Sequence, residues 1–367
     1  MKFSCEKAVL LSGVTAAARS VSTRSSIPAL EGILIDARQE SVTLSGYNLA
    51  TGIRAEIGAN VESQGAAVLN ARLFSDIVRK LPDDYITVSA DDKLMVSITC
   101  GLSEFKILGL PAEDFPALPE PEEDLSLSMK QTVLKSMIDM TIFAVSDNEN
   151  KPIHTGALFD VKQGFLTVVA VDGYRMAVRK EPVVSSEETF SFVVPAAALR
   201  EVERLCGDGE DDVKISLGKR HIAFDMENVL LISRLLEGEF LNYDAALPKT
   251  VEHSVTVDTK DLQTAVERVS LIISERLKNP VRCVFDKEKL HIWCQTALGK
   301  ADDEIPVGGD CEEIEIGFNN RYLHDAVRAV PDEKICIEIT NSLSPCVIKP
   351  LEGDSYLFMI LPVRLKA

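Results

Sequence analysis

The sequence predicts an α+β protein made of three similar domains, each with two helices packed on antiparallel sheets. Three observations predict it. The chain has 367 residues, which is longer than a domain with a single hydrophobic core usually is. Two helical patterns recur in each third of the chain, and short alternating apolar runs lie in clusters between them. Because strands and helices do not alternate one by one, antiparallel sheets are favoured over a doubly wound parallel sheet.

The first helical pattern has a leucine at its start and a serine twelve positions later. It occurs at residues 10–22, 134–146 and 262–274, at spacings of 124 and 128 residues. The second pattern is centred on Val78, Val202 and Val327, at spacings of 124 and 125 residues, and an apolar run follows each copy. Residues three or four positions apart share one face of a helix. Each third is therefore expected to contain two helices in corresponding places.

Short runs of alternating apolar and polar residues between the helices predict antiparallel strands. Their links are brief and rich in Asp, Gly, Asn and Lys, which suits hairpin turns. Paired as hairpins, these strands would form the sheets on which the helices pack. The predicted strands are residues 32–37, 41–46, 158–161, 166–171, 282–285 and 289–294.

Two proline-containing stretches mark the seams between the domains. Pro111, Pro116, Pro119 and Pro121 lie in an acidic stretch, and Pro248 lies in a second stretch at residues 242–252. Repeated prolines disfavour both a helix and a central strand. The predicted domains are residues 1–121, 122–249 and 250–367.

The chain is strongly acidic, with 39 Lys and Arg against 57 Asp and Glu and a formal net charge of −18. Taken alone, this charge argues against nucleic-acid binding, which depends on cationic side chains that neutralise phosphates. The charge is unevenly placed, however. The helical windows 7–20, 70–81, 130–145, 196–206, 260–273 and 319–330 sum to +6, which leaves −24 on the strands and loops. A repeated, mildly basic helix surface could face a polyanion; solvated helix faces with a chance charge balance are the alternative.

The sequence contains no recognisable catalytic motif. It lacks the GxxxxGK[ST] phosphate loop, the GxGxxG fingerprint, the HExxH zinc motif and the GxSxG nucleophile elbow. The five histidines lie far apart without metal-ligand spacing. Acidic pairs such as Asp83-Asp84 and Asp211-Asp212 lie in predicted turns, where solvated carboxylates are common. We expect no catalytic centre, no bound metal and no cofactor; an enzyme that uses the acidic pairs on nucleic acid is the alternative.

The eight cysteines are scattered without a CxxC pair, and most lie in apolar runs. They are therefore predicted to be buried thiols in a reducing compartment. Glu6 and Lys7 interrupt the N-terminal stretch, which favours an amphipathic helix over a signal peptide. No run reaches the roughly eighteen apolar residues that span a bilayer. The sequence predicts a cytoplasmic protein with no membrane partner.

Six short motifs occur in order from one end of the chain to the other. They are MKF at residues 1–3, RSSIPAL at 24–30, LPAEDFP at 110–116, VDGYRMA at 171–177, IGFN at 316–319 and LPVRL at 361–365. Together they resemble the bacterial DNA sliding clamps, the family of the β subunit of the DNA polymerase III holoenzyme. One such motif alone would be a weak signal, whereas six in register are specific.

The resemblance implies a head-to-tail homodimer that closes as a six-domain ring around double-stranded DNA. Such a ring carries out no chemistry. It slides on DNA of any sequence and acts as a processivity factor that holds the replicative DNA polymerase to its template. The other partners that the resemblance implies are the clamp loader, repair polymerases and further proteins with a clamp-binding motif. A scaffold of the same fold that docks peptides without encircling DNA is the alternative.

The resemblance also implies DNA-facing residues in the first two domains. Arg24 matches a family arginine in a loop after the first helix, and Arg72 and Arg79 lie on the second helix. Asn148 lies in the loop at 147–150, where the family has a polar residue that contacts DNA. Few contacts are expected, because each neutralised phosphate tightens binding and many would prevent sliding.

One peptide-binding groove per chain, between the second and third domains, is a further implication of the resemblance. An apolar pocket with a few polar groups suits a Leu or Phe anchor from an extended peptide. The groove residues carried over by motif are Gly173, Tyr174, Arg175, Met176, Asn319, Tyr322, Leu361, Pro362, Val363, Arg364 and Leu365, and the positions that complete the wall are His154, Val171, Leu241, Leu343 and Pro345.

The ring-closing contact is expected between the strand at 103–108 of one chain and the end of the first helix of the third domain in the other. Phe105 and Ile107 are predicted to point outward from the strand, against Ile272 and Ile273. Isologous self-association, in which the same patch meets itself, is the alternative.

Overall fold

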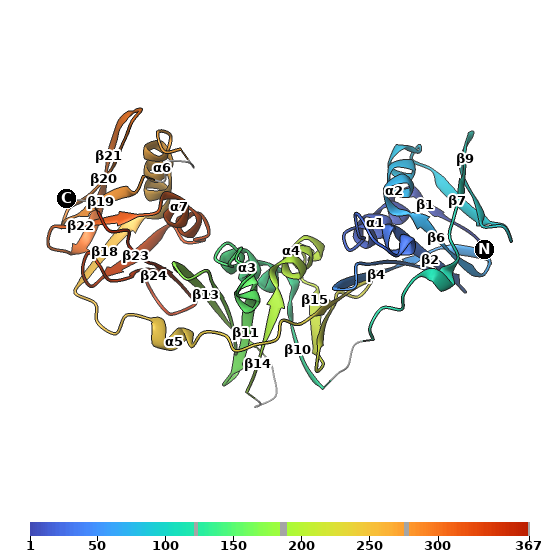
Figure 1. Cartoon of the computed structure of the whole chain (residues 1–367), viewed down its shortest axis with the longest axis horizontal. Coiled ribbons are helices and arrows are strands. Elements are labelled where there is room, and N and C mark those ends of the chain that lie inside the picture. Colours follow the sequence, from blue (N-terminus) through green and yellow to red (C-terminus); the bar gives the residue numbers. More distant parts are fainter. Residues whose placement is uncertain (121–123, 184–188, 275–278, 366–367) are drawn as a thin grey trace. The chain divides into compact units, whose positions relative to one another are not determined.

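The computed structural model describes residues 1–120, 124–183, 189–274 and 279–365 (Figure 1). By its internal packing the chain divides into two compact units. Unit 1 comprises Met1–Leu134 and Arg200–Leu235, and unit 2 comprises Lys135–Leu199 and Leu236–Ala367. Helices α3 (Gln131–Ile142) and α4 (Ala196–Leu205) contribute residues to both units. The pairings between described strands are antiparallel, which confirms the predicted α+β class.

Unit 1 contains two sheets, with the strand orders β5-β1-β7-β8-β9 and β10-β15-β16-β17-β4-β3-β2-β6. Between β17 and β4, Val229 pairs with Ala55, so strands from the first and second thirds of the chain form one continuous sheet. The bounds in unit 1 are β1 (Lys2–Glu6), α1 (Lys7–Ala18), β2 (Gly32–Arg38), β3 (Ser41–Tyr47), β4 (Thr51–Gly58), β5 (Asn60–Ser63), β6 (Gly65–Asn70), α2 (Ala71–Lys80), β7 (Tyr85–Ala90), β8 (Met95–Cys100), β9 (Ser103–Leu108), β10 (Leu125–Lys130), β15 (Asp212–Leu217), β16 (His221–Asp225) and β17 (Val229–Arg234).

Unit 2 contains the strand order β14-β11-β12-β13-β25-β24-β23-β18-β21-β20-β19-β22. Between β13 and β25, Met176 pairs with Met359, and this pairing joins the second and third thirds of the chain. The bounds in unit 2 are β11 (Gly156–Lys162), β12 (Phe165–Val171), β13 (Arg175–Pro182), β14 (Phe190–Pro195), α5 (Tyr243–Ala246), β18 (His253–Asp258), α6 (Thr259–Ser270), β19 (Val281–Phe285), β20 (Lys289–Thr296), β21 (Gly299–Asp310), β22 (Ile314–Phe318), α7 (Asn320–Arg328), β23 (Lys334–Ile339), β24 (Cys346–Pro350) and β25 (Tyr356–Ile360).

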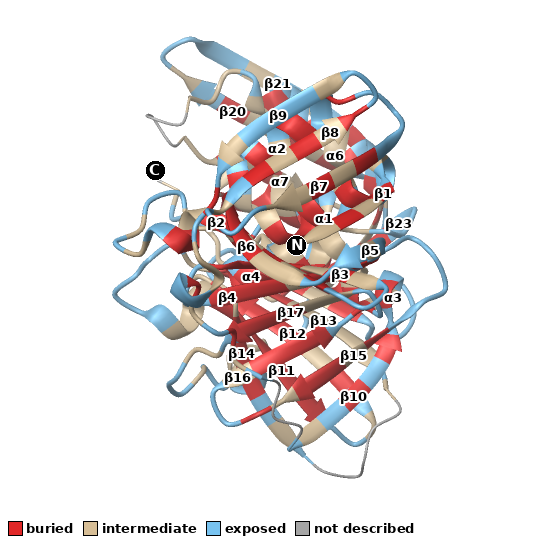
Figure 2. Ribbon diagram, turned by 90° about the vertical axis from the view of Figure 1, so that its right-hand side faces the viewer, coloured by how far each residue is buried: buried red, intermediate tan, exposed pale blue. Residues whose placement is uncertain are grey.

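Helices α2, α6 and α7 begin where a capping side chain precedes an apolar stripe. Before α2, the Asn70 side-chain oxygen accepts a hydrogen bond from the backbone N–H of Leu73. The side chains of Phe74, Ile77 and Val78 then recur at helical spacing and are buried. Asp258 and Asn319 cap α6 and α7 in the same way. The buried side chains of α1 and α2 belong to one core cluster with those of the unit 1 strands, and Figure 2 colours buried residues red.

The first helix of each third begins three residues and ends four residues earlier than its leucine-to-serine pattern. The helices are Lys7–Ala18, Gln131–Ile142 and Thr259–Ser270. In α1, the N–H groups of Arg19 and Ser20 bond to Ala16 and Ala17, three residues back, and this tighter turn ends the helix. Because Arg19 and Lys130 fall just outside the observed bounds, the six repeated helices carry +4 rather than +6. The helices remain mildly basic within an acidic chain.

The predicted domain ranges do not coincide with the two compact units. The first predicted boundary lies at residues 121 and 122, outside the described residues. The units depart from a division into thirds because β17 pairs with β4 and β13 pairs with β25, so each unit contains a sheet shared by neighbouring thirds. The ranges 1–121, 122–249 and 250–367 stay a prediction.

All eight cysteines are free and buried, as the sequence predicts. Burial raises the pKa of the Cys5 thiol to about 11 and that of Cys346 to about 12, so both thiols stay protonated at neutral pH. Among the described residues, no helix combines the length and apolarity needed to cross a membrane.

Candidate peptide groove and nucleic-acid interface

The β13–β25 junction in unit 2 brings the two most distinctive motifs of the chain together. Arg175 pairs with Ile360, and the backbone N–H of Leu361 donates to the carbonyl oxygen of Tyr174 at 2.8 Å. Two residues later, the N–H of Val363 donates to the carbonyl of Gly317 on β22, also at 2.8 Å. Residues 173–176 and 361–365, nearly two hundred positions apart in sequence, therefore line one surface.

Beneath this surface lies an apolar cluster. Met176 and Val171 are 1% and 3% exposed, so they form the floor rather than the rim. Phe240 and Leu247 from the segment around α5 pack on the same cluster while remaining partly exposed. The buried members are Leu158, Val169, Val171, Met176, Val193, Val347 and Met359.

Two stacked tyrosines form an aromatic wall. Tyr174 is 62% exposed, and its ring lies 6.3 Å from that of Tyr322 with an interplanar angle of 24°. The turn before Tyr174 contains Gly173 at φ +91°, a left-handed conformation that favours glycine. The Asn319 oxygen accepts hydrogen bonds from the N–H groups of Arg321 and Tyr322, so its amide nitrogen is the group left to donate to a ligand.

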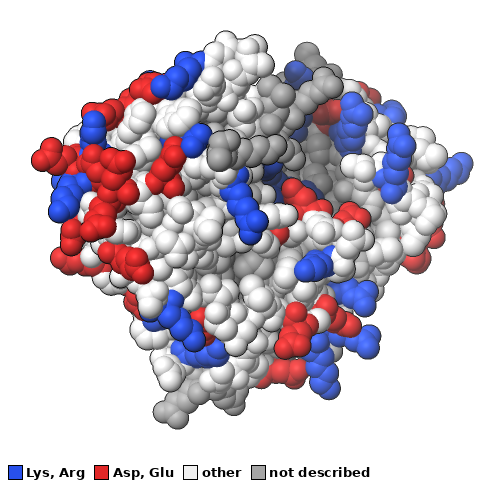
Figure 3. Space-filling view, turned by 60° about the vertical axis from the view of Figure 1, so that its left-hand side comes forward, with Lys and Arg blue, Asp and Glu red and all other residues white. Residues whose placement is uncertain are grey.

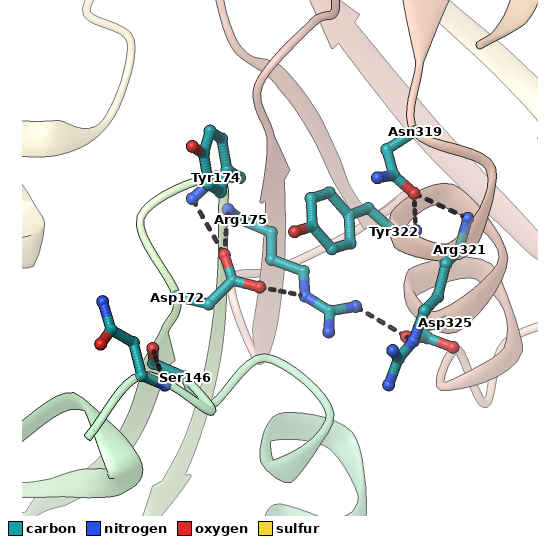
Figure 4. A network of polar contacts seen from close by, with 9 residues as sticks. Ser146, Asp172, Tyr174, Arg175, Asn319, Arg321, Tyr322 and Asp325 are labelled. Carbon is teal, nitrogen blue, oxygen red and sulfur yellow. Dashed lines mark hydrogen bonds and ion pairs between the residues drawn. The ribbon is translucent and has the colours of Figure 1, made fainter. Parts of the chain in front are cut away.

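Arg175 is buried and already paired (Figure 4). Its Nε donates to Asp172 Oδ2 at 2.8 Å, and its Nη1 donates to Asp325 Oδ2 at 2.7 Å. The guanidinium lies 4.4 Å from the centre of the Tyr322 ring. Because both carboxylates occupy its donors, Arg175 holds the Tyr174 turn against α7 and is less able than an exposed arginine to bind a ligand directly.

His154 and Leu241 are next in sequence to Ile153 and Phe240, which pack on the floor. The His154 ring meets Phe240 edge to face at 5.4 Å. Burial, and secondarily the nearby Lys151, lowers the pKa of His154, so its neutral form is favoured. Leu241 is 46% exposed. The first side chain thus adds a polar edge to an otherwise apolar wall, and the second is open to a ligand.

The remaining predicted groove residues come from two loops. Leu343, 70% exposed, and Pro345 lie in the turn between β23 and β24, which the side chain of Asn341 fixes by accepting the N–H groups of residues 343 and 344. Val363 and Arg364 are exposed, and Pro362 is half-buried. The Leu365 side chain packs over Gly317, where any Cβ would lie 2.5 Å from it.

One tyrosine fastens the α5 segment to the second third of the chain. Tyr243 donates its hydroxyl to Asp160 Oδ2 at 2.9 Å, and Lys162 pairs with the same oxygen at 2.6 Å. Asp160 is only 3% exposed. Burial and this carboxylate raise the pKa of Tyr243. Its hydroxyl therefore stays protonated and donates the hydrogen bond. The bond holds Phe240, Leu241 and Leu247 in place above the floor.

The predicted DNA-facing residues are all exposed. In the described part of the chain Arg24 and Arg72 form no ion pair, whereas Arg79 pairs with Asp76 at 3.2 Å. The Asn148 side-chain oxygen accepts the N–H of Asn150, which leaves its amide as the free donor. Figure 3 shows basic and acidic side chains interleaved over one face rather than gathered in a single basic patch.

Two strand edges are open within the individual units. In the described chain β9 pairs only with β8, and the half of β21 at residues 299–306 pairs only with β20. Phe105 on β9 is 40% exposed, while Ile107 is only half-exposed because it packs on the core of unit 1. Ile272 and Ile273 follow the end of α6 and are half-buried.

A hollow of about 730 Å³ is lined by Ile273 and by the predicted groove residues Asn319 and Tyr322.

Within the described residues, no group of three or more His, Cys, Asp or Glu side chains could hold a metal ion. The acidic pairs are accounted for by local contacts. Asp83 pairs with Lys7 at 2.8 Å, and Asp303 pairs with Arg268 at 2.6 Å. The geometry offers carboxylates to neighbouring cations and not to a shared ligand.

Models of the N-terminal, central and C-terminal domains of the DNA polymerase III beta subunit match residues 1–119, 128–242 and 244–364. The beta sliding clamp of Halalkalibacterium halodurans is 33% identical to this chain over 379 residues, which cover 99% of this chain and 100% of the relative. The chain belongs to the beta sliding clamp family. The beta sliding clamp of Staphylococcus epidermidis strain RP62A is 29% identical to this chain, and the match covers 99% of each chain.

Solved clamp structures share the fold over their whole length. The Bacillus subtilis sliding clamp is 30% identical, with a TM-score of 0.95 and complete coverage of both chains. A structure described as a putative DNA polymerase III beta subunit of Eubacterium rectale is 33% identical, with a TM-score of 0.94 and 99% coverage of both. A Pseudomonas aeruginosa clamp bound to griselimycin is 26% identical, with a TM-score of 0.95 and complete coverage of both. The predicted three-domain clamp fold is therefore confirmed.

Beta sliding clamps are DNA polymerase processivity factors and not enzymes, which sets aside the carboxylate-dependent enzyme. Sequence reasoning missed three residues around the groove. Met359 and Phe240 have no motif of their own, although Met359 stands two positions before LPVRL. The role of Asp325 could not be predicted from the sequence, because its partner Arg175 lies 150 positions away.

Proposed function

We propose that two copies of this chain close head to tail into a ring around double-stranded DNA, and that the ring tethers a replicative DNA polymerase to its template in the cytoplasm. The observation that carries the proposal is the meeting of residues 173–176 and 361–365 above an apolar floor, in a chain of the beta sliding clamp family. Three parts of the proposal rest on separate residues: ring closure, DNA contact and peptide capture.

Ring closure uses the two open strand edges. Unpaired N–H and C=O groups on an edge strand favour pairing with another chain. Strand β9 of one protomer adds to the free half of β21 in the other, with Phe105 covered by the partner's α6 end at Ile272 and Ile273. Because the two edges differ, the contact is heterologous, and two such contacts close a ring.

DNA contact uses few cations. Arg24 and Arg72 have no ion-pair partner among the described residues, Arg79 shares its charge with Asp76, and Asn148 adds a neutral donor. Each contacted phosphate adds about 0.9 to the salt exponent of DNA affinity, so a small set gives weak, mobile binding. Topological closure then supplies the retention that these contacts do not.

Peptide capture uses the floor of Met176 and Val171 with the rim of Tyr174, Leu241 and Leu343. The exposed rim covers an apolar anchor, and polar groups at the edge bond the peptide backbone. Polymerase, clamp loader and repair polymerases would present such segments in turn. Griselimycin, which is bound in the Pseudomonas aeruginosa and Bartonella birtlesii clamp structures, is expected to compete with them.

The experiment measures binding of a fluorescein-labelled peptide. The peptide is the clamp-binding segment of the replicative polymerase from the same organism as this chain. Tyr174→Ala is expected to weaken binding by about tenfold, because it removes an aromatic rim residue. Tyr85→Ala is the matched control, since Tyr85 is 61% exposed and lies on β7 of unit 1. Equal affinities for Tyr174→Ala, Tyr85→Ala and the unchanged chain would place the peptide site elsewhere.

A further inference from the structure

A small apolar hollow lies beside the groove, where the segment after α5 crosses β23, β24 and β25. Its volume is about 100 Å³. Leu247, Pro248 and Val251 form one wall. Pro345, Val347 and Leu357 form the other. Of these residues only Pro345 is among the predicted groove residues, so the hollow adjoins the groove and is lined mainly by side chains outside its motifs.

The hollow and the groove share one apolar surface. Leu247, Val347 and Leu357 belong to the same cluster as the groove floor residues Val171 and Met176. Val347 pairs with Met359, which in turn pairs with Met176, so three neighbouring strands carry the surface from groove to hollow. The apolar packing is therefore continuous from the groove floor to the hollow.

Backbone and side-chain bonds hold the walls of the hollow in place. Thr340 donates its hydroxyl to the carbonyl of Thr250 at 2.5 Å, and the N–H of Glu252 donates to the carbonyl of Ile339 at 3.1 Å. At the margin, Lys349 and Glu338 neutralise one another in an ion pair of 2.5 Å. The hollow is thus preformed and presents no net charge to a ligand, which suits an apolar side chain.

We propose that the hollow receives one aliphatic side chain from a residue that flanks the groove-binding segment of a partner protein. The inference rests on the proposed function, because the groove must hold the segment first. A dry apolar cavity of roughly 150 Å³ accommodates benzene. A hollow of about 100 Å³ therefore takes a branched aliphatic chain of the size of Val or Leu and excludes an aromatic ring. The hollow selects among partners whose core motifs are alike.

The test compares Leu and Ser flanks on one peptide in three proteins. A fluorescein-labelled peptide from the replicative polymerase is extended beyond its anchor, on each side in turn, with Leu or with Ser at the flanking positions. On one side Leu is expected to bind about tenfold more tightly than Ser to the unchanged chain. Val251→Glu, on the exposed rim, is expected to abolish that preference and to leave the unextended peptide unaffected. Leu351→Glu, similarly exposed but outside the hollow, is the control and keeps the preference.

The outcomes separate this inference from the proposed function. Loss of the Leu preference in Val251→Glu alone supports the hollow. If the unextended peptide binds and Leu and Ser flanks bind equally on both sides, the hollow plays no part while the groove stands. If the unextended peptide does not bind, the proposed groove itself fails. A flanking Phe that binds as well as Leu would overturn the stated size limit.

Discussion

Arg175 donates from Nη1 to Asp325 Oδ2 at 2.7 Å, and this ion pair joins the turn that carries Tyr174 to helix α7. Asp172 accepts from the same guanidinium at 2.8 Å. The arginine side chain is 6% exposed and Asp325 is 24% exposed. Removing one carboxylate leaves the buried Arg175 charge only partly neutralised. This is more destabilising than the loss of an exposed ion pair.

Asp325→Asn is expected to lower the free energy of unfolding by about 2 kcal/mol, since the buried Arg175 loses one of its two carboxylates. The control is Asp303→Asn. Asp303 is similarly buried, at 20% exposed, but its partner Arg268 is 57% exposed, so about 0.5 kcal/mol is expected. Urea denaturation measures both, and equal losses would contradict a special role for Arg175.

The sequence predicts the local elements well and the joins between them poorly. The helices follow from apolar spacing and caps such as Asn70 and Asn319, and the hairpins follow from alternation and turn residues. The pairing of β17 with β4 and of β13 with β25 has no local signal, because backbone hydrogen bonds across an edge do not depend on residue identity. The Arg175–Asp325 bond depends on the second of these joins.

Tyr243→Phe is expected to weaken peptide binding about threefold to tenfold, because the loss of one hydrogen bond to buried Asp160 frees the α5 segment. Fluorescence anisotropy with the polymerase peptide measures it. Tyr356→Phe is the matched control, since Tyr356 donates to Asp332 at 2.6 Å away from the α5 segment. If both variants lose thermal stability while peptide affinity stays unchanged, the Tyr243 hydrogen bond stabilises the fold and has no role in peptide binding.

Peptide binding is expected to weaken in mild acid through His154. Burial lowers the pKa of His154 below its usual 6.5 in the folded chain, and a bound peptide would bury it further. Protons therefore favour the unbound and the unfolded states, so both affinity and stability hold above pH 6.5 and decline as the pH falls through the lowered pKa. Affinities measured at pH 7.5 and 5.5 test this. His154→Leu should remove the difference; an unchanged pH dependence would assign it to another group.

Phe105→Ala is expected to weaken the dimer by about tenfold or more, because it removes the exposed aromatic of the open edge strand β9. Sedimentation equilibrium over a concentration series measures the dissociation constant. Phe165→Ala is the matched control, with Phe165 39% exposed on β12. Identical constants for the two variants would place the ring contact on another surface.

The central claim is that the protein holds DNA by encircling it, and retention on circular DNA tests this most directly. The protein is loaded onto a nicked circular plasmid by the clamp loader with ATP, and bound and free protein are separated by gel filtration. Retention is expected on the circle and loss within the run once a restriction enzyme linearises it, since the few contacts of Arg24, Arg72 and Arg79 do not hold the ring in place. Equal retention on linear and circular DNA would contradict encirclement.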